Sequence, residues 1–345
     1  MQEPFPVLKS LYINSRNSKT AALPAKFLGG SAPCLQEIDL NSIPFVELPT
    51  LLLSTNDLVY LDLRNIPPSG YISPEAMVAG LAALPRLVEF VMAFRSAVRS
   101  PAPLHQPPVT RTVLPALTFF LFAGTSGYME DLAARIHAPQ LNHIKIHYFE
   151  RFFLSVAQLP KFIDRSIGPK LALFKYAHVT FGDFCVYFDT YCHANDPDSG
   201  SPFARTTVDF RGIHQQVQYI AEVLRHFSAT LSHAVHLKLG VHYRCRQQLE
   251  DRDNIRWLRL LRQFTPVKTL CVNRLLAGVI AVALEGMTVE MSAKVLPSLD
   301  LIFLEGQRAS SIERFIAARQ LSGHSVTIVD TKTEFDERLK SYITE

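Results

Sequence analysis

The sequence predicts an α/β solenoid, in which copies of one strand-and-helix unit stack side by side. A short strand pattern, Leu-x-x-Φ-x-Φ with Φ an apolar residue, recurs along the chain at intervals of about 23 to 35 residues. Apolar residues at helical spacing occupy several of these intervals. A single unit of this kind cannot bury its apolar side alone. Stacking of the units therefore predicts a parallel sheet on one face and a row of helices on the other.

The clearest unit runs from Leu114 to Ile146. It contains an alternating apolar strand at 117–122, a helical run at 128–136 and the next strand at 141–146. Side chains alternate between the two faces of a strand. Both Φ positions are therefore expected in the core, and the residue between them is expected on the open face of the sheet.

The same strand pattern occurs before and after this unit. Strong copies begin at Leu8, Leu35, Leu58, Leu87, Leu117, Leu141 and Leu171, and weaker copies lie at Val208, Val235, Leu270, Leu299 and Val326. Regular leucine-rich repeats have periods of 20–29 residues, so this array is an irregular version. We expect one leucine-rich-repeat-like domain over residues 1–345, shaped as a horseshoe with the parallel sheet on its concave face and the helices on its convex face.

Helix signals support the same organisation. Ser73-Pro74 provides an N-cap residue followed by proline at the first helical position. The strongest amphipathic helix is expected at about 213–227, and another near Leu258. Ser310 and Glu313 fit a capping box. A last helix at about 333–343 is expected to cover the open end of the stack.

The composition indicates an intracellular protein, cytoplasmic or nuclear. The chain has 345 residues, 48% of them hydrophobic, and a net charge of +4, which favours neither nucleic acid nor a membrane as partner. The five cysteines include no Cys-x-x-Cys, which predicts reduced thiols rather than disulfides. No signal peptide is visible. The most apolar run, 275–284, is about half the roughly 20 residues of a membrane span and predicts a buried helix.

Residues 114–181 resemble the repeat region of fungal F-box proteins. The resemblance lies in Pro-Ala-Leu117-Thr-x-Phe-x-Phe, in Tyr128-Met-Glu-Asp-Leu132-x-x-Arg-Ile136-x-Ala-Pro-Gln-Leu, and in 158–181. It implies a substrate-recognition role in a ubiquitin ligase. The strand pattern starts at Leu8, which leaves no room for the roughly 40-residue F-box helices. We therefore expect ligase subunits as partners only if an F-box lies upstream.

The candidate binding surface is the row of outward residues between the two Φ positions. In order they are Tyr12, Asp39, Asp62, Val91, Leu121, Lys145, Lys175, Asp209, His236, Cys271 and Phe303. The concave sheet face of a solenoid is the usual binding surface. We therefore predict that a protein partner contacts the polar members of this row, namely Asp39, Asp62, Lys145, Lys175, Asp209 and His236. Lys145 and Lys175 are expected on adjacent strands with Asp209 beside them.

No catalytic, metal or cofactor site is expected. His143 and His147 are four residues apart on a strand, which places them about 13 Å apart and too far to share a metal. Neither a nucleophile elbow nor a phosphate-binding loop occurs. Arg252, Arg256 and Arg259 form a basic stripe of the kind usually found on a solvated helix face. The acidic loop at 196–200 lacks most ligands of a calcium loop and indicates a turn.

These observations favour a non-catalytic protein-interaction module. Two alternatives remain at this stage. One is an enzyme or metabolite-binding protein with a site in a loop such as 191–202, and the other is a truncated remnant that folds without activity.

Overall fold

The computed structural model describes residues 5–15, 22–24, 26–97, 110–149, 157–192, 204–209, 213–242, 254–306 and 309–329. They belong to two compact units, unit 1 with residues 1–168 and unit 2 with residues 169–345, and each is described by itself. One continuous domain over residues 1–345 therefore stays a prediction. The helix expected at 333–343 lies outside the described residues.

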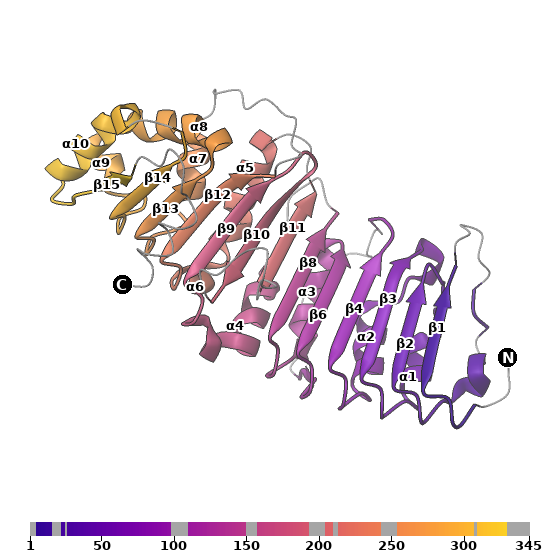
Figure 1. Ribbon diagram of the computed structural model, residues 1–345. Helices are drawn as coiled ribbons and strands as arrows, with labels where there is room; N and C mark the ends of the chain where they lie inside the picture. Colours follow the sequence, from indigo (N-terminus) through magenta and orange to yellow (C-terminus); the bar gives the residue numbers. More distant parts are fainter. Residues whose placement is uncertain are drawn as a thin grey trace. The chain divides into compact units, whose positions relative to one another are not determined.

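Unit 1 contains one parallel sheet with one strand from each repeat. In spatial and chain order the strands are β1 (Ser10–Asn14), β2 (Glu37–Asn41), β3 (Tyr60–Ile66), β4 (Glu89–Phe94), β6 (Phe119–Gly124) and β8 (His143–Tyr148). Figure 1 shows α1 (Leu48–Leu52), α2 (Pro74–Leu81) and α3 (Ser126–Arg135) on one side of these strands. The remaining elements are the 3-10 turns η1 (Phe27–Gly30) and η2 (Pro68–Gly70), the short parallel pair β5 (Thr112–Val113) and β7 (Ile136–His137), and α4 (Gln158–Leu171), whose last three residues belong to unit 2.

The Leu-x-x-Φ-x-Φ pattern fixes the register of these strands. From the second copy to the sixth, the Leu and both Φ residues are at most 3% exposed, as in Leu35, Ile38 and Leu40. One residue after the Leu, a carbonyl accepts two backbone N–H groups of the next copy, as Gln36 does from Val59 and Tyr60. The same step recurs at Val59, Val88 and Thr118, which keeps each copy in phase with its neighbour.

The core of unit 1 is aromatic as well as aliphatic. Phe90 stacks on Phe120 at 5.5 Å between ring centroids, and Tyr128 of α3 lies 5.0 Å from Phe94. The buried Tyr128 hydroxyl donates to the Ile72 carbonyl at 3.0 Å. Aromatic pairs of this geometry add specific contacts to the hydrophobic burial, so they tie α3 to the strands in front of it.

Unit 2 contains a mixed sheet. Its strands are ordered β11 (Ala204–Asp209), β10 (Cys185–Tyr191), β9 (Tyr176–Phe181), β12 (His236–Val241), β13 (Thr269–Val272), β14 (Leu301–Leu304) and β15 (Thr327–Val329). β9 and β12 to β15 pair in parallel, whereas β10 is antiparallel to both β9 and β11. The strand predicted at Val208 is β11, which pairs antiparallel to β10 and therefore runs in the same direction as β9. The strand that breaks the predicted parallel order is β10. Only three residues separate β9 from β10, and a parallel connection requires a crossover of a dozen or more.

The helices of unit 2 confirm several sequence predictions. They are α5 (Ile213–Arg225), α6 (Ser228–Leu231), α7 (Asn254–Leu261), α8 (Arg274–Glu285), α9 (Val289–Ser292), the 3-10 turn η3 (Ala309–Ile312) and α10 (Glu313–Leu321). The apolar run forms the largely buried helix α8, capped by Asn273. The capping box at Ser310 is wrong, because Ile312 is the N-cap of α10 and makes no side-chain cap bond.

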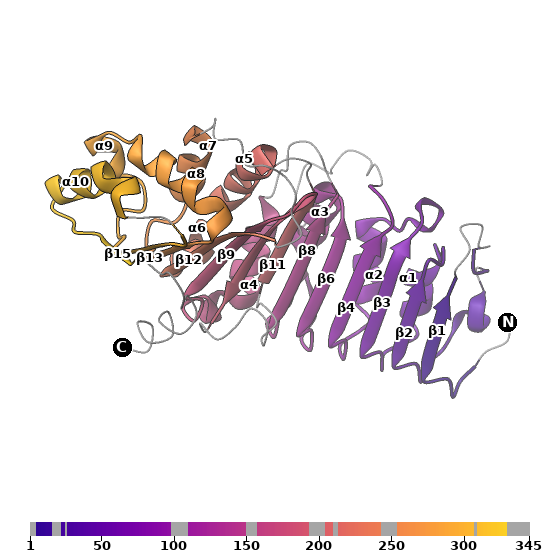
Figure 2. The same ribbon diagram turned by 45° about the horizontal axis from the view of Figure 1, so that its top comes forward.

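The structure is thus mixed α/β, with mostly parallel strands and helices packed against them, as the repeats indicated. Figure 2 turns the same ribbon and shows α1 and α2 behind β1 to β4. The horseshoe curvature stays a prediction. Within the part of the chain that the structure describes, no helix combines the length and apolar character needed to cross a membrane.

Candidate interaction surface

The side of the unit 1 sheet that faces away from α1, α2 and α3 carries the outward side chains of all six strands, and we call it the open face. Strand register arranges these side chains in rows across the sheet. The central row is Tyr12, Asp39, Asp62, Val91, Leu121 and Lys145, and the row before it is Ser10, Glu37, Tyr60, Glu89, Phe119 and His143. The central row has the register predicted from the sequence, with Asp39, Asp62 and Lys145 at their expected positions.

Asp62 is the most buried polar member of the open face. It is only 1% exposed. The Tyr60 hydroxyl donates to one of its oxygens at 2.8 Å, and the Arg64 guanidinium donates Nε–H to both oxygens at 2.9 and 3.0 Å. Burial, together with the bond to Asp62, raises the pKa of Tyr60 to about 12. The positive charge of Arg64 is therefore already committed to Asp62.

The carboxylates around Asp62 have no basic partner of this kind. Glu37 accepts hydrogen bonds from the hydroxyls of Tyr12 and, with a smaller effect, Ser10, and both bonds lower its pKa. No hydrogen bond or ion pair joins Asp39 or Glu89 to another described residue. Burial and the neighbouring charge of Asp62 raise the pKa of Asp39. Glu37, Asp39 and Glu89 thus present negative charge that no ion pair among the described residues neutralises, while Arg64 acts on Asp39 only at longer range.

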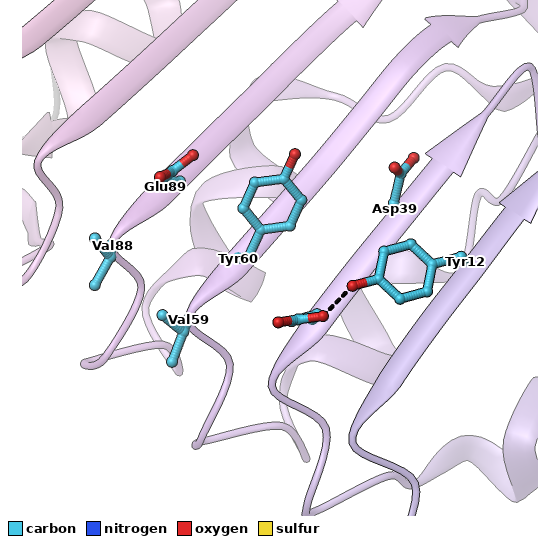
Figure 3. Close-up of a pocket in the computed structure, with 7 residues that line it drawn as sticks. Tyr12, Asp39, Val59, Tyr60, Val88 and Glu89 are labelled. Atoms are coloured by element: carbon cyan, nitrogen blue, oxygen red, sulfur yellow. Dashed lines mark hydrogen bonds between the residues drawn. The ribbon is translucent and has the colours of Figure 1, made fainter.

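A shallow hollow of about 360 Å³ lies among these residues. Its lining comes from four neighbouring strands and the turns before them, and consists of Tyr12, Glu37, Asp39, Val59, Tyr60, Val88 and Glu89. Figure 3 shows Tyr60 between Glu89 on one side and Asp39 and Tyr12 on the other. Tyrosine rings and carboxylates therefore share one opening, with two valines along its edge.

Farther along the sheet, the open face becomes apolar and then basic. Val91 is buried, whereas Leu121 and Phe119 are half-buried. The Lys145 ammonium lies 5.5 Å from the centre of the Phe119 ring. His143 and Lys145 are also half-buried. The open face therefore runs from acidic through apolar to basic in the order of its strands, as the sequence row predicted for these positions.

In unit 2 the predicted row is wrong in register at three positions. Lys175 precedes β9, and its carbonyl accepts N–H groups from Val235 and His236. In β12 the central position is Lys238, and His236 points outward two residues before it. The His236 ring stacks on Tyr176 at 4.6 Å between centroids. Asp209 ends the antiparallel strand β11, opposite Cys185. The structure does not align these three side chains in one row.

The actual central row of unit 2 contains residues that the sequence reasoning missed. In register the row is Arg205, Asp189, His178, Lys238, Cys271 and Phe303. The last two are at their predicted positions, and the first four were not predicted. Arg205 forms two bonds of 2.7 and 2.9 Å with the buried Asp189. Burial, with a smaller effect of Lys238, lowers the pKa of His178 to about 3. The predicted outward positions were shifted because Phe174 and Ala234 occupy the places where the repeats of unit 1 carry the leucine that begins the pattern.

Other groups considered from the sequence form no site among the described residues. No three metal-binding side chains converge there. Arg256 and Arg259 lie on α7, whereas Arg252 and the acidic loop at 196–200 lie outside the described residues. Most of the loop at 191–202 is likewise outside them.

Comparisons with solved structures find similarities to known proteins, one of them to a leucine-rich repeat protein. The chain is similar to the crystal structure of the leucine-rich repeat-containing protein LegL7 from Legionella pneumophila, with 13% sequence identity, 93% of this chain and 92% of that chain covered, and a TM-score of 0.32. No protein-family model matches the chain. No curated protein matches it either. The resemblance to fungal F-box proteins therefore stays a prediction.

Proposed function

We propose that the protein is a non-catalytic binding module that holds a protein partner on the open face of unit 1. The observation that supports this proposal is the arrangement of the face itself. Acidic, apolar and basic side chains follow one another across six strands whose register is fixed by backbone hydrogen bonds.

The physical argument rests on preorganisation. The backbone of a paired sheet loses little further freedom when a partner binds, which lowers the entropic cost of association. Protein interfaces combine an apolar centre with a polar rim. Leu121 and Phe119 provide such a centre, and the acidic and basic ends of the face provide the rim. Charge at both ends also selects the orientation of a partner.

The finer proposal is that the partner is a substrate presented to a ubiquitin ligase. It rests on the resemblance of residues 114–181 to the repeat region of F-box proteins. This role requires an F-box in the same polypeptide. We therefore treat the appearance of cullin and RING subunits in partner capture as its test.

The experiment uses three versions of the protein as bait in a lysate of the source organism, with quantitative mass spectrometry. One is unchanged, one carries Leu121→Asp with Lys145→Glu on the open face, and one carries the control Lys161→Glu. Lys161 is exposed on α4 and lies outside the open face.

We expect at least one partner that falls at least about fivefold with the open-face variant, a change of roughly 1 kcal/mol, and stays unchanged with the control. Equal capture by all three baits would contradict the proposal. In that case a metabolite that raises the melting temperature would favour the loop-borne enzyme. No ligand of either kind would favour a remnant without activity.

A further inference from the structure

The hollow on the open face of unit 1 has a composition that selects a particular kind of group. In register, Tyr60 on β3 is flanked directly by Glu37 on β2 and Glu89 on β4. Adjacent strands are about 4.8 Å apart, so two carboxylates stand on either side of one tyrosine ring within reach of a group placed over it. Asp39 adds a third carboxylate to the same opening.

Aromatic rings attract cations through the negative potential of their faces. The Tyr60 hydroxyl donates a hydrogen bond to the Asp62 carboxylate, and this bond to an anion increases the electron density of the ring. Burial raises the pKa of Tyr60, so the phenol remains a neutral donor in this arrangement. The ring and its flanking carboxylates therefore act together on one positive charge.

The described residues provide no positive charge of their own to fill this place. Arg64 is held by Asp62 through bonds of 2.9 and 3.0 Å. Glu37 is held only by the neutral hydroxyls of Ser10 and Tyr12. A bare metal ion is disfavoured, because no three metal-binding side chains converge among the described residues. The complementary group is an organic cation with an apolar stem, which Val59 and Val88 at the edge of the hollow can contact.

We propose that the hollow lined by Tyr12, Glu37, Asp39, Tyr60 and Glu89 binds the cationic side chain of a basic segment of the protein partner, with the charge over Tyr60 and between Glu37 and Glu89. This inference rests on the proposed function and names the chemistry of the partner. Lysine and arginine share that chemistry, since both carry an alkyl stem and a terminal positive charge.

The test begins with an array of immobilised synthetic peptides that differ at one central position, where lysine, arginine, glutamine or leucine stands between randomised flanks. The unchanged protein is expected to prefer a central lysine or arginine. The peptide of highest signal is then labelled, and its dissociation constant is measured by fluorescence anisotropy for the variants.

Glu37→Gln with Glu89→Gln is expected to weaken binding about tenfold, which corresponds to about 1.4 kcal/mol. The matched control, Glu47→Gln with Asp57→Asn, removes two charges outside the open face and should leave binding within twofold. Tyr60→Phe keeps the ring and should retain most of the affinity, whereas Tyr60→Leu should lose at least fivefold. Circular dichroism and thermal melting confirm that each variant is folded.

Absence of any peptide signal, or a signal without preference for lysine or arginine, would overturn the inference. An equal loss in the control would do the same, because it would show non-specific attraction to net charge. The proposed function fails separately, when no protein partner depends on Leu121 and Lys145. A partner that depends on these two residues but is unaffected by Glu37→Gln with Glu89→Gln would leave the function standing and remove the cation site.

Discussion

Asp39 and Asp62 occupy the same row on neighbouring strands of the open face. Like charges directly across a sheet destabilise the folded state. Asp62 is compensated by Arg64 and Tyr60, whereas Asp39 is half-buried and has no such partner among the described residues. A carboxylate retained at a cost in stability is typical of residues that act on a ligand.

We predict that Asp39→Asn stabilises the protein at neutral pH. The pKa of Asp39 is raised in the fold by burial and by Asp62, so its ionised form opposes folding. The stability that the neutral carboxyl contributes is fully present below the ordinary pKa of 3.8. It is lost as the pH rises through the raised pKa of the folded state. The gain should stay below about 1 kcal/mol, because the group is partly solvated.

The measurement is urea unfolding of both proteins at neutral pH and again below pH 3.8. The difference should be present in the first condition and absent in the second. A loss of stability at neutral pH would mean that Asp39 makes a favourable interaction in the fold.

Arg319 in unit 2 is a second residue with an identifiable role. It is 1% exposed, and its guanidinium donates to the carbonyls of Ser292, Pro297 and Leu299 at 3.2, 2.9 and 3.2 Å. Burial lowers its pKa. These bonds hold α10 against the segment that leads from α9 into β14, and they satisfy carbonyls that have lost contact with water.

Arg319→Met should therefore destabilise unit 2 by about 3 kcal/mol, because it leaves buried carbonyls without donors. Fluorescence of the buried Trp257, the single tryptophan of the chain, reports the unfolding of this unit. The matched control is Arg314→Met on the same helix, where the side chain is 85% exposed and a change within about 0.5 kcal/mol is expected. Equal effects of both substitutions would show that the three carbonyl bonds do not matter.

At the scale of secondary-structure elements, Gly124 ends β6 at a place with no room for a side chain. A Cβ atom at this position would lie 2.7 Å from the Phe122 ring and 2.9 Å from the Phe94 ring. The end of the strand therefore packs directly on two aromatic side chains of the core. Gly127, three residues later in α3, has nothing within 4 Å of such an atom.

Two alanine substitutions should consequently act in opposite directions. Gly124→Ala is expected to destabilise unit 1 by about 1–3 kcal/mol through overpacking. Gly127→Ala should stabilise it by about 0.5–1 kcal/mol, because alanine favours the helix. Thermal unfolding followed by circular dichroism gives both values. A destabilising Gly127→Ala would indicate that α3 requires flexibility there.

The elements also show how far the sequence could predict the structure. In unit 1 a leucine begins each copy, so both the strands and the residues on the open face follow from the pattern. In unit 2, Phe174 and Ala234 replace that leucine and their copies were shifted. The hairpin of β9 and β10 was missed, although Gly182-Asp183 between two alternating runs is a turn signal. The hollow itself was not predicted, because Tyr60 and Glu89 lie two residues before the central row. Only the central row follows from the spacing of the apolar positions.

At the scale of the molecule, each strand of unit 1 pairs only with its immediate neighbours in the sheet. Stability in such arrays is approximately a sum of repeats and the contacts between neighbours. A substitution in one repeat should therefore change the stability mainly of that repeat and its neighbours.

We predict that Gly124→Ala lowers amide hydrogen-exchange protection most in β4, β6 and β8 and least in β1 and β2. Hydrogen exchange with mass spectrometry on the unchanged protein and the variant tests this. The Lys161→Glu protein, changed at an exposed position of α4, serves as a control that should leave the six strands unaffected. A uniform loss over all six strands would indicate that unit 1 opens only as a whole.

The spacing of the strands has a consequence for the backbone of a bound segment. Glu37 and Glu89 lie on β2 and β4, which are two strand spacings apart, about 9.6 Å. One turn of a polyproline II helix advances about 9.3 Å and returns to the same side every third residue. A segment of this conformation laid across the strands therefore meets every second strand with every third side chain. In an extended β segment, side chains on the same side are instead about 6.7 Å apart, which matches neither one strand spacing nor two.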